Sequence, residues 1–142
     1  MGKSMKTAAI VQARMGSTRF PNKVMKLIEG IPMVEILLKR LKEAKEIDEI
    51  ILATSSDAKN IPLVEHVQKL GFQVYQGSEE DVLGRYYHAA SLCSADLVVR
   101  ITGDCPLVDP ELVDQMVREC KKERVDYFSN VFPPTYPDGL DI

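Results

Sequence analysis

The stretch TAAIVQARMGSTRFPNK, residues Thr7–Lys23, joins an apolar run to a loop that is rich in cations. Its first part, Thr7–Ala13, is almost continuously apolar, which is typical of a strand buried on both faces of a parallel sheet. Arg14, Arg19 and Lys23 then follow around a Gly-Ser pair. The whole chain has a formal net charge of −3, so this loop is a local concentration of positive charge.

Further apolar runs alternate with helical patterns along the chain. Strands are predicted over Thr7–Ala13, Glu49–Thr54, Phe72–Gln76, Leu97–Thr102 and Asp126–Val131. Helices are predicted over Met33–Glu46 and Asn60–Leu70, from a cap at Ser78 to about Cys93, and after a cap at Asp109 with Pro110 at the first helical position. This alternation indicates an α/β fold with a doubly wound, mostly parallel sheet. The longest stretch expected to be irregular is Arg14–Pro32, at the carboxyl end of the first strand, where such sheets collect functional residues.

Length and composition narrow the class of protein. The chain has 142 residues, which is enough for one domain, residues 1–142, but not for two ordinary ones. No apolar run approaches the roughly 20 residues that a membrane span needs, and the start lacks the apolar core of a signal peptide. The widely spaced Cys93, Cys105 and Cys120 fit neither a disulfide framework nor a zinc site. We therefore expect a cytoplasmic protein without membrane insertion, and the acidic chain argues against general nucleic-acid binding.

The loop after the first strand has the chemistry of a polyphosphate cradle. Gly16 permits a close backbone approach, and successive N–H groups around Met15, Gly16 and Ser17 can form an anion-binding nest. Arg14 and Arg19 can fork onto phosphate oxygens, and Lys23 adds a point charge. The alternative is a solvated basic loop with a turn glycine. Neither the P-loop nor the dinucleotide fingerprint occurs in the sequence.

A second motif, RITGDCPLVDP, spans Arg100–Pro110. Asp104 follows a buried strand directly, where a lone carboxylate can hold Mg²⁺ together with substrate phosphates. The small Gly103 removes side-chain bulk beside it. Asp104 can equally be a turn aspartate, since Gly-Asp before Cys-Pro is ordinary turn chemistry.

Two further segments offer polar groups. The second predicted strand ends at Thr54, Ser55 and Ser56. Their hydroxyl and backbone groups either contact the edge of a base or form a turn. On the third predicted helix, Tyr86 shares the apolar face, Arg85 points off that face toward a nucleotide, and His88 is expected at the surface. The cysteines are expected to be small buried residues rather than nucleophiles.

Taken together, the motifs resemble those of the sugar cytidylyltransferases, which include the enzymes that make CMP-Kdo and CMP-sialic acid. The resemblance rests on the pattern A-R-x-G-S-x-R-x-P-x-K followed by G-D-x-P-L. The segments DVLGRYY, RITGDCPL and PDGLDI are most similar to a subgroup of spore-coat polysaccharide biosynthesis proteins. The resemblance implies the Rossmann-like nucleotide-diphospho-sugar transferase fold.

The resemblance also implies roles for individual residues. The phosphates would be bound by Arg14, Ser17, Arg19 and Lys23, with the backbone of Met15 and Gly16. The metal, Mg²⁺, would be held by Asp104. The base would be contacted by Gln12, Ala13, Thr54, Gly77, Ser78 and Arg85. Arg14, Lys23 and Asp104 would support catalysis, which is transfer of CMP from CTP to a sugar or sugar phosphate with release of pyrophosphate.

The chain departs from the family pattern by stopping at Ile142, which predicts a C-terminally truncated domain. Asp138 and Asp141 either contact an acceptor sugar's hydroxyls or belong to a frayed terminus. Family members carry a dimer arm beyond this point, so a homodimer is one expectation for the full-length form. The alternatives to a cytidylyltransferase are a non-catalytic nucleotide-binding fragment and a glycosyltransferase of similar fold that uses a nucleotide sugar. A glycosyltransferase would usually carry a D-x-D motif after a strand, but this chain has Gly103-Asp104-Cys105 at the corresponding place.

Overall fold

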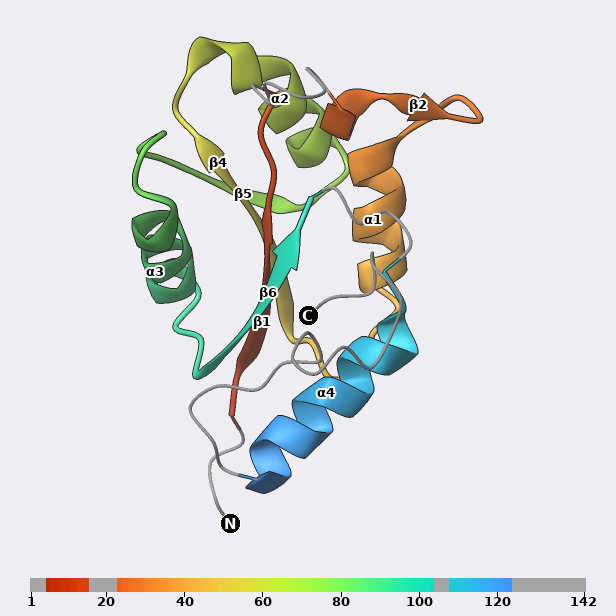
Figure 1. The fold of residues 1–142 in the computed structure, drawn as a ribbon, viewed down its shortest axis with the longest axis vertical. Helices are drawn as coiled ribbons and strands as arrows, with labels where there is room; N and C mark the ends of the chain where they lie inside the picture. Colours follow the sequence, from red (N-terminus) through yellow and green to blue (C-terminus); the bar gives the residue numbers. More distant parts are fainter. Residues whose placement is uncertain (1–4, 16–22, 104–107, 124–142) are drawn as a thin grey trace.

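The computed structural model describes residues 5–15, 23–103 and 108–123. Within these residues, the central sheet contains β1 (Thr7–Gln12), β4 (Glu49–Ser55), β5 (Gln73–Gly77) and β6 (Leu97–Thr102), in the spatial order β5-β4-β1-β6 (Figure 1). Each of the three pairings is parallel. The predicted doubly wound α/β sheet is therefore confirmed. The predicted strand Asp126–Val131 lies outside the described residues.

The strand order places a topological switch point beside β1. The chain runs outward from β1 through β4 to β5 and then returns to the other side of β1 with β6. In open α/β sheets, ligands bind in the crevice where the strand order reverses, outside the carboxyl ends of the strands. In this chain the strand order reverses between β1 and β6, so we expect a ligand outside the carboxyl ends of these two strands.

Helices cover both faces of the sheet. On one face, α1 (Met33–Leu41), α2 (Ile61–Lys69) and α4 (Pro110–Glu123) enclose a core with Ala9 and Val11 of β1. On the other face, α3 (Val82–Leu92) packs against Ala8 and Ile10 (Figure 1). The two sets alternate along β1, as expected for a strand buried on both sides. No helix among the described residues is long and apolar enough to cross a membrane.

Several helix ends agree with the sequence. The carboxylate of Asp109 accepts a hydrogen bond from the Glu111 N–H at 2.9 Å, which confirms Asp109 as the cap of α4. Gly71, with φ +92°, follows the last turn of α2 as predicted. A 3₁₀ turn, η2 (Ala58–Asn60), precedes α2.

Other boundaries differ from the predictions. Helix α1 ends at Leu41 rather than Glu46, because the N–H groups of Lys45 and Glu46 donate to the Asp114 carboxylate, at 2.9 and 2.7 Å, instead of continuing the helix. Ser78 is not the cap of α3: Asp81 caps it, accepting from the Gly84 N–H at 2.8 Å. Strand β5 is shifted by one residue from Phe72–Gln76 to Gln73–Gly77.

The stretch Arg14–Pro32 is also not wholly irregular. It contains a 3₁₀ turn, η1 (Lys23–Met25), and a hairpin of β2 (Leu27–Ile28) and β3 (Ile31–Pro32). The two residues between these strands, Glu29 and Gly30, both have positive φ, as a tight two-residue hairpin requires. The apolar alternation was too short to predict such strands.

Candidate functional site

The carboxyl ends of β1 and β6 meet closely at the switch point. The Gly103 N–H donates to the Gln12 carbonyl at 2.6 Å, while on the other side of β1 the Ala13 N–H donates to the Ala53 carbonyl of β4 at 3.2 Å. A Cβ on Gly103 would lie 2.6 Å from the Ala13 Cβ and 2.8 Å from the Gln12 oxygen, so no side chain fits there. This confirms the interpretation of Gly103 as a residue that removes bulk. Asp104 follows immediately but lies outside the described residues.

Of the three cationic side chains in the predicted phosphate loop, the structure describes that of Arg14. Its side chain is about half exposed, and its Nη1 lies 3.6 Å from Oε1 of Glu79, which is itself partly exposed. Gln12 and Ala13 precede it at the end of β1. Gly16, Ser17 and Arg19 lie outside the described residues, as do Asp138 and Asp141; Lys23 begins η1, but its side chain is not described.

The start of the loop is tied to the connection after β4. The Met15 N–H donates to Oδ1 of Asn60 at 2.8 Å, and the Asn60 side chain is fully buried. The Met15 side chain belongs to the core beneath. The Met15 N–H, which the sequence suggested as part of an anion nest, therefore has a protein acceptor in this structure.

The hydroxyl-bearing residues after β4 are mostly buried. Thr54 and Ser55 are both inaccessible to solvent. The Thr54 hydroxyl has no hydrogen-bond partner among the described residues. Ser55 Oγ donates to Oε2 of Glu79 and accepts from Nδ2 of Asn60 at 2.6 Å. Ser56 is exposed, and its N–H donates to the Gly77 carbonyl at 2.8 Å, which joins the loops after β4 and β5.

Arg85, which was predicted to point off the apolar face of its helix toward a nucleotide, is buried. Only 2% of it is exposed. Its Nη1 donates to the carbonyls of Ser78, at 2.8 Å, and Glu79, at 3.1 Å. Its Nε is buried and has no partner among the described residues. The guanidinium therefore holds two carbonyls of the loop between β5 and α3. Gly77 packs against the aliphatic part of Arg85, since a Cβ on Gly77 would lie 3.2 Å from Cγ of Arg85.

Two smaller expectations are confirmed: Tyr86 is buried in the core, and His88 is exposed. The expectation of buried cysteines holds for Cys93, whose thiol pKa is raised by burial. It was wrong for Cys120, which is half-buried, and Cys105 lies outside the described residues. Among the described residues, no group of three or more His, Cys, Asp and Glu side chains is arranged to hold a metal ion.

Asn60 and Glu79 belong to this site but were not predicted from the sequence. Asn60 was counted as part of a helix, because an Asn at a helix start ordinarily caps it. Glu79 was counted as a charge in the first turn of the next helix. Neither residue type, at its position, carries a signal that it reaches another loop.

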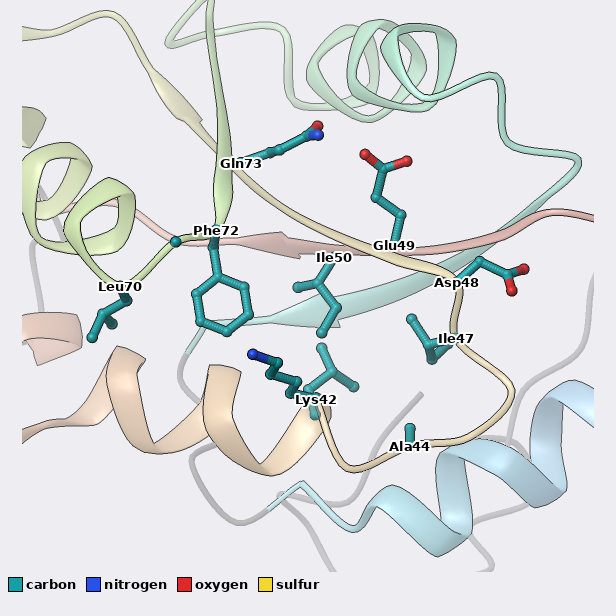
Figure 2. A pocket seen from close by; sticks show the side chains of 11 residues that line it. Lys42, Ala44, Ile47, Asp48, Glu49, Ile50, Leu70, Phe72 and Gln73 are labelled. Carbon is teal, nitrogen blue, oxygen red and sulfur yellow. The ribbon is translucent and has the colours of Figure 1, made fainter.

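A hollow of about 300 Å³ lies at the opposite edge of the sheet (Figure 2). Ile47, Ile50 and Phe72 form its apolar wall, and the Lys42 ammonium lies 5.9 Å from the centre of the Phe72 ring. It adjoins the amino ends of β4 and β5, and none of the residues predicted to bind nucleotide lines it. The candidate site therefore remains the carboxyl edge at the switch point.

Comparison with protein families places the chain in a class. The model of the cytidylyltransferase family matches residues 8–136, and the chain belongs to this family. A protein of Methanocaldococcus jannaschii is 46% identical over 125 residues, which cover 88% of this chain and 51% of that protein. The spore coat polysaccharide biosynthesis protein SpsF of Bacillus subtilis is 38% identical, over 83% of this chain and 51% of its own length. The 3-deoxy-manno-octulosonate cytidylyltransferase of Pelobacter propionicus is 33% identical, over 80% and 44%.

Solved structures agree with this assignment. A cytidylyltransferase from Leptospira borgpetersenii superposes with a TM-score of 0.91 at 34% identity, over 97% of this chain and 59% of that one. A CMP:2-keto-3-deoxy-manno-octonic acid synthetase, determined in complex with CTP, shares the fold at 23% identity with a TM-score of 0.74, over 84% and 49%. The chain spans about half the length of the curated relatives it matches.

Proposed function

We propose that this chain provides the nucleotide-binding part of a cytidylyltransferase that transfers CMP from CTP to a sugar or sugar phosphate. The observation that carries the proposal is the junction of β1 and β6, where Gly103 packs against the backbone of Gln12 and Ala13. This junction brings the start of the cationic loop and the position before Asp104 to one crevice. The name of the Bacillus subtilis relative supports a role in surface polysaccharide biosynthesis.

In the proposed reaction an acceptor oxygen attacks the α-phosphorus of CTP. A new oxygen–phosphorus bond forms, the bond to the β-phosphate oxygen breaks, and pyrophosphate leaves with that electron pair. The protein contributes position and charge rather than a covalent intermediate. Arg14, Arg19 and Lys23 would neutralise the triphosphate, with Gly16 and Ser17 offering backbone donors.

We propose a divalent cation for this site. Asp104 follows β6 in the sequence, and a carboxylate oxygen is the ligand type that Mg²⁺ takes together with phosphate oxygens and water. When bound, Mg²⁺ would stabilise negative charge on the phosphates. Further metal ligands would come from outside the described residues, since these contain no complete cluster.

For the base, we propose the rim formed by the loops after β1, β4 and β5, with Gln12, Ala13, Thr54, Gly77 and Ser78. Arg85 would act from beneath by fixing the carbonyls of Ser78 and Glu79. Because the Thr54 hydroxyl is buried, backbone groups of this rim would provide most of the contacts. Competition of CTP binding by UTP and ATP measures how far this rim selects cytosine.

The first experiment is calorimetric titration of CTP into the chain, with Mg²⁺ and with EDTA. We expect Mg²⁺ to strengthen binding and Asp104→Asn to abolish most of this gain while leaving thermal stability nearly unchanged, because the amide keeps the shape and removes the charge. Asp109→Asn is the matched control, since Asn also caps helices well, and it should keep the full Mg²⁺ effect. Absence of CTP binding by the wild type would refute the proposal; a full Mg²⁺ effect in Asp104→Asn would make Asp104 a turn residue.

Turnover is tested separately. The chain is incubated with CTP, Mg²⁺ and a panel of sugars and sugar phosphates, and pyrophosphate is measured. Release that depends on one acceptor class identifies the substrate, and Asp138→Asn and Asp141→Asn test whether those carboxylates contact it. Binding of CTP without release would assign this chain nucleotide binding alone.

A further inference from the structure

Asn60 occupies the position before α2 but does not cap this helix. No side-chain hydrogen bond joins it to the first turn of α2. Its amide instead joins the loop after β1 to the end of β4: Oδ1 accepts from the Met15 N–H at 2.8 Å, and Nδ2 donates to Ser55 Oγ at 2.6 Å and to the Ser55 carbonyl at 3.3 Å. An Asn at this place ordinarily stabilises its own helix, so the contact to Met15, which is 45 residues away, replaces a local one.

These contacts are buried, which makes them strong constraints. Asn60 and Ser55 are both 0% exposed. A buried amide or N–H group that loses its partner is destabilised more than the bond itself is worth, because water cannot replace the partner. The Met15 N–H is therefore held in one place, and with it the peptide that leads from Arg14 into the cationic loop.

The same set of contacts reaches the charged group of Arg14. Ser55 Oγ, which accepts from Asn60, donates to Oε2 of Glu79, and Oε1 of Glu79 lies 3.6 Å from Nη1 of Arg14. Asn60 and Ser55 thus connect the loops after β1, β4 and β5. The segment Arg14–Met15 is restrained twice, at the Met15 N–H and at the Arg14 guanidinium.

We infer that Asn60 is a positioning residue for the nucleotide site, which fixes Met15 and thereby the approach of Arg14 to the phosphates. This inference rests on the proposed function. A neutral amide suits the role, because it accepts the Met15 N–H without placing a carboxylate next to bound phosphates. At the opposite edge of the sheet, the N–H groups of Lys6 and Thr7 are instead held by side-chain carboxylates, those of Asp96 and Asp48. The Met15 N–H then serves the site as a structural donor and not as a phosphate ligand.

The test compares two buried side chains that each hold backbone N–H groups. Asn60→Ala removes the acceptor of Met15. Asp114→Ala removes the acceptor of Lys45 and Glu46, far from the proposed crevice. Both variants should lower the melting temperature. CTP affinity, measured well below both melting temperatures, should fall about tenfold in Asn60→Ala, equivalent to one lost hydrogen bond, and by less than about twofold in Asp114→Ala.

A second readout follows the contact itself and needs no ligand. Amide hydrogen exchange at Met15, measured by NMR, should accelerate about tenfold or more in Asn60→Ala and stay unchanged in Asp114→Ala. Ser55→Ala is the milder variant should Asn60→Ala fail to fold; it removes one partner of Nδ2 and should give the same two changes at smaller size.

Each outcome decides the matter. Equal affinities in wild type and Asn60→Ala, or equal losses in Asn60→Ala and Asp114→Ala, would overturn the positioning role while leaving the proposed function in place. If the wild type binds no CTP, the proposed function fails, and faster Met15 exchange would then show Asn60 to be a purely structural tether.

Discussion

Side chains that are distant in sequence accept backbone N–H groups at both edges of the sheet, but the accepting groups differ. At the amino edge the acceptors are carboxylates: Asp96 accepts from the Lys6 N–H and Asp48 from the Thr7 N–H, each at 2.8 Å. At the carboxyl edge the Met15 N–H is held by the neutral Asn60, and the guanidinium of Arg85 holds two carbonyls from below.

Both edges contain buried polar groups without a partner among the described residues: the Thr54 hydroxyl and the Arg85 Nε at the carboxyl edge, and the Thr7 hydroxyl at the amino edge. What distinguishes the two edges is the chemistry of their exposed side chains. The carboxyl edge carries the half-exposed guanidinium of Arg14. The hollow at the amino edge is walled by partly buried apolar residues such as Ile50 and Phe72 (Figure 2). We therefore expect an anionic ligand at the carboxyl edge.

The largest expected effect tests this difference with one cation from each edge. Arg14→Ala should weaken CTP binding by roughly 1.5–3 kcal/mol, one to two decades in affinity, because a charge-assisted contact is lost. Lys42→Ala, beside Phe72 at the amino edge, should leave binding unchanged. Calorimetric titration of both variants measures the effect, and equal affinities would remove the functional distinction between the edges.

The next prediction concerns the junction of β1 and β6. Gly103→Ala would place a methyl group 2.8 Å from the Gln12 carbonyl oxygen, which is backbone and cannot rotate away. We expect a loss of roughly 1–3 kcal/mol in the free energy of unfolding, together with weaker CTP binding as the strand ends separate.

The hairpin glycine provides the control for this substitution. Gly30 has φ +83° and open space around it, so Gly30→Ala should lower stability by about 1 kcal/mol through backbone strain and leave CTP affinity unchanged. Urea unfolding and CTP titration of both variants separate the two mechanisms. If Gly103→Ala binds CTP like the wild type, the junction does not shape the site.

The Glu35 carboxylate of α1 tests stability without binding, since it pairs with Lys39 of the same helix and contacts His66 of α2. Hydrogen bonds from Lys39 and from His66 lower the pKa of Glu35 below its usual value near 4.5. A lowered carboxyl pKa stabilises the fold above the unfolded-state pKa, and this contribution disappears as the pH falls through the folded-state pKa. Glu35→Gln should therefore lower the melting temperature at pH 7 but not at pH 3, and CTP affinity at pH 7 should not change. A deficit that persists at pH 3 would assign the effect to packing rather than charge.

The sequence predicted the sheet because β1, β4 and β6 carry strong local signals: near-continuous apolar runs such as Ala8–Val11 have few alternatives to a strand buried on both faces. It also located the candidate site, since the cationic loop follows β1 and Asp104 follows β6. These are properties of residues and their immediate neighbours.

What the sequence could not give were the contacts between distant loops. The early end of α1 depends on Asp114, whose carboxylate accepts hydrogen bonds from the N–H groups of Lys45 and Glu46. These residues are 69 and 68 positions away in the sequence. The burial of Arg85 depends on carbonyls of a loop whose path no local pattern fixes, and an amphipathic helix pattern assigns Arg to the outer face. Asn60 resembles a helix cap in sequence, and only its distance to Met15 shows a different use.

The smallest expected effect concerns Glu79, the carboxylate at the carboxyl edge that opposes the charge of Arg14. The pair is partly exposed, with atoms 3.6 Å apart, so it contributes about 0–1 kcal/mol to stability. Glu79→Gln keeps an oxygen that accepts from Ser55 and removes the negative charge. If Arg14 serves a triphosphate, loss of this competing carboxylate should raise CTP affinity about two- to fivefold at low salt, and the gain should shrink at higher ionic strength as screening increases. The same substitution in an Arg14→Ala background should give a smaller gain, because the two charges act on one another. Titrations of the four proteins at two salt concentrations complete this cycle; an unchanged or lower affinity in Glu79→Gln would mean that Glu79 supports the nucleotide site through Ser55 and does not compete for Arg14.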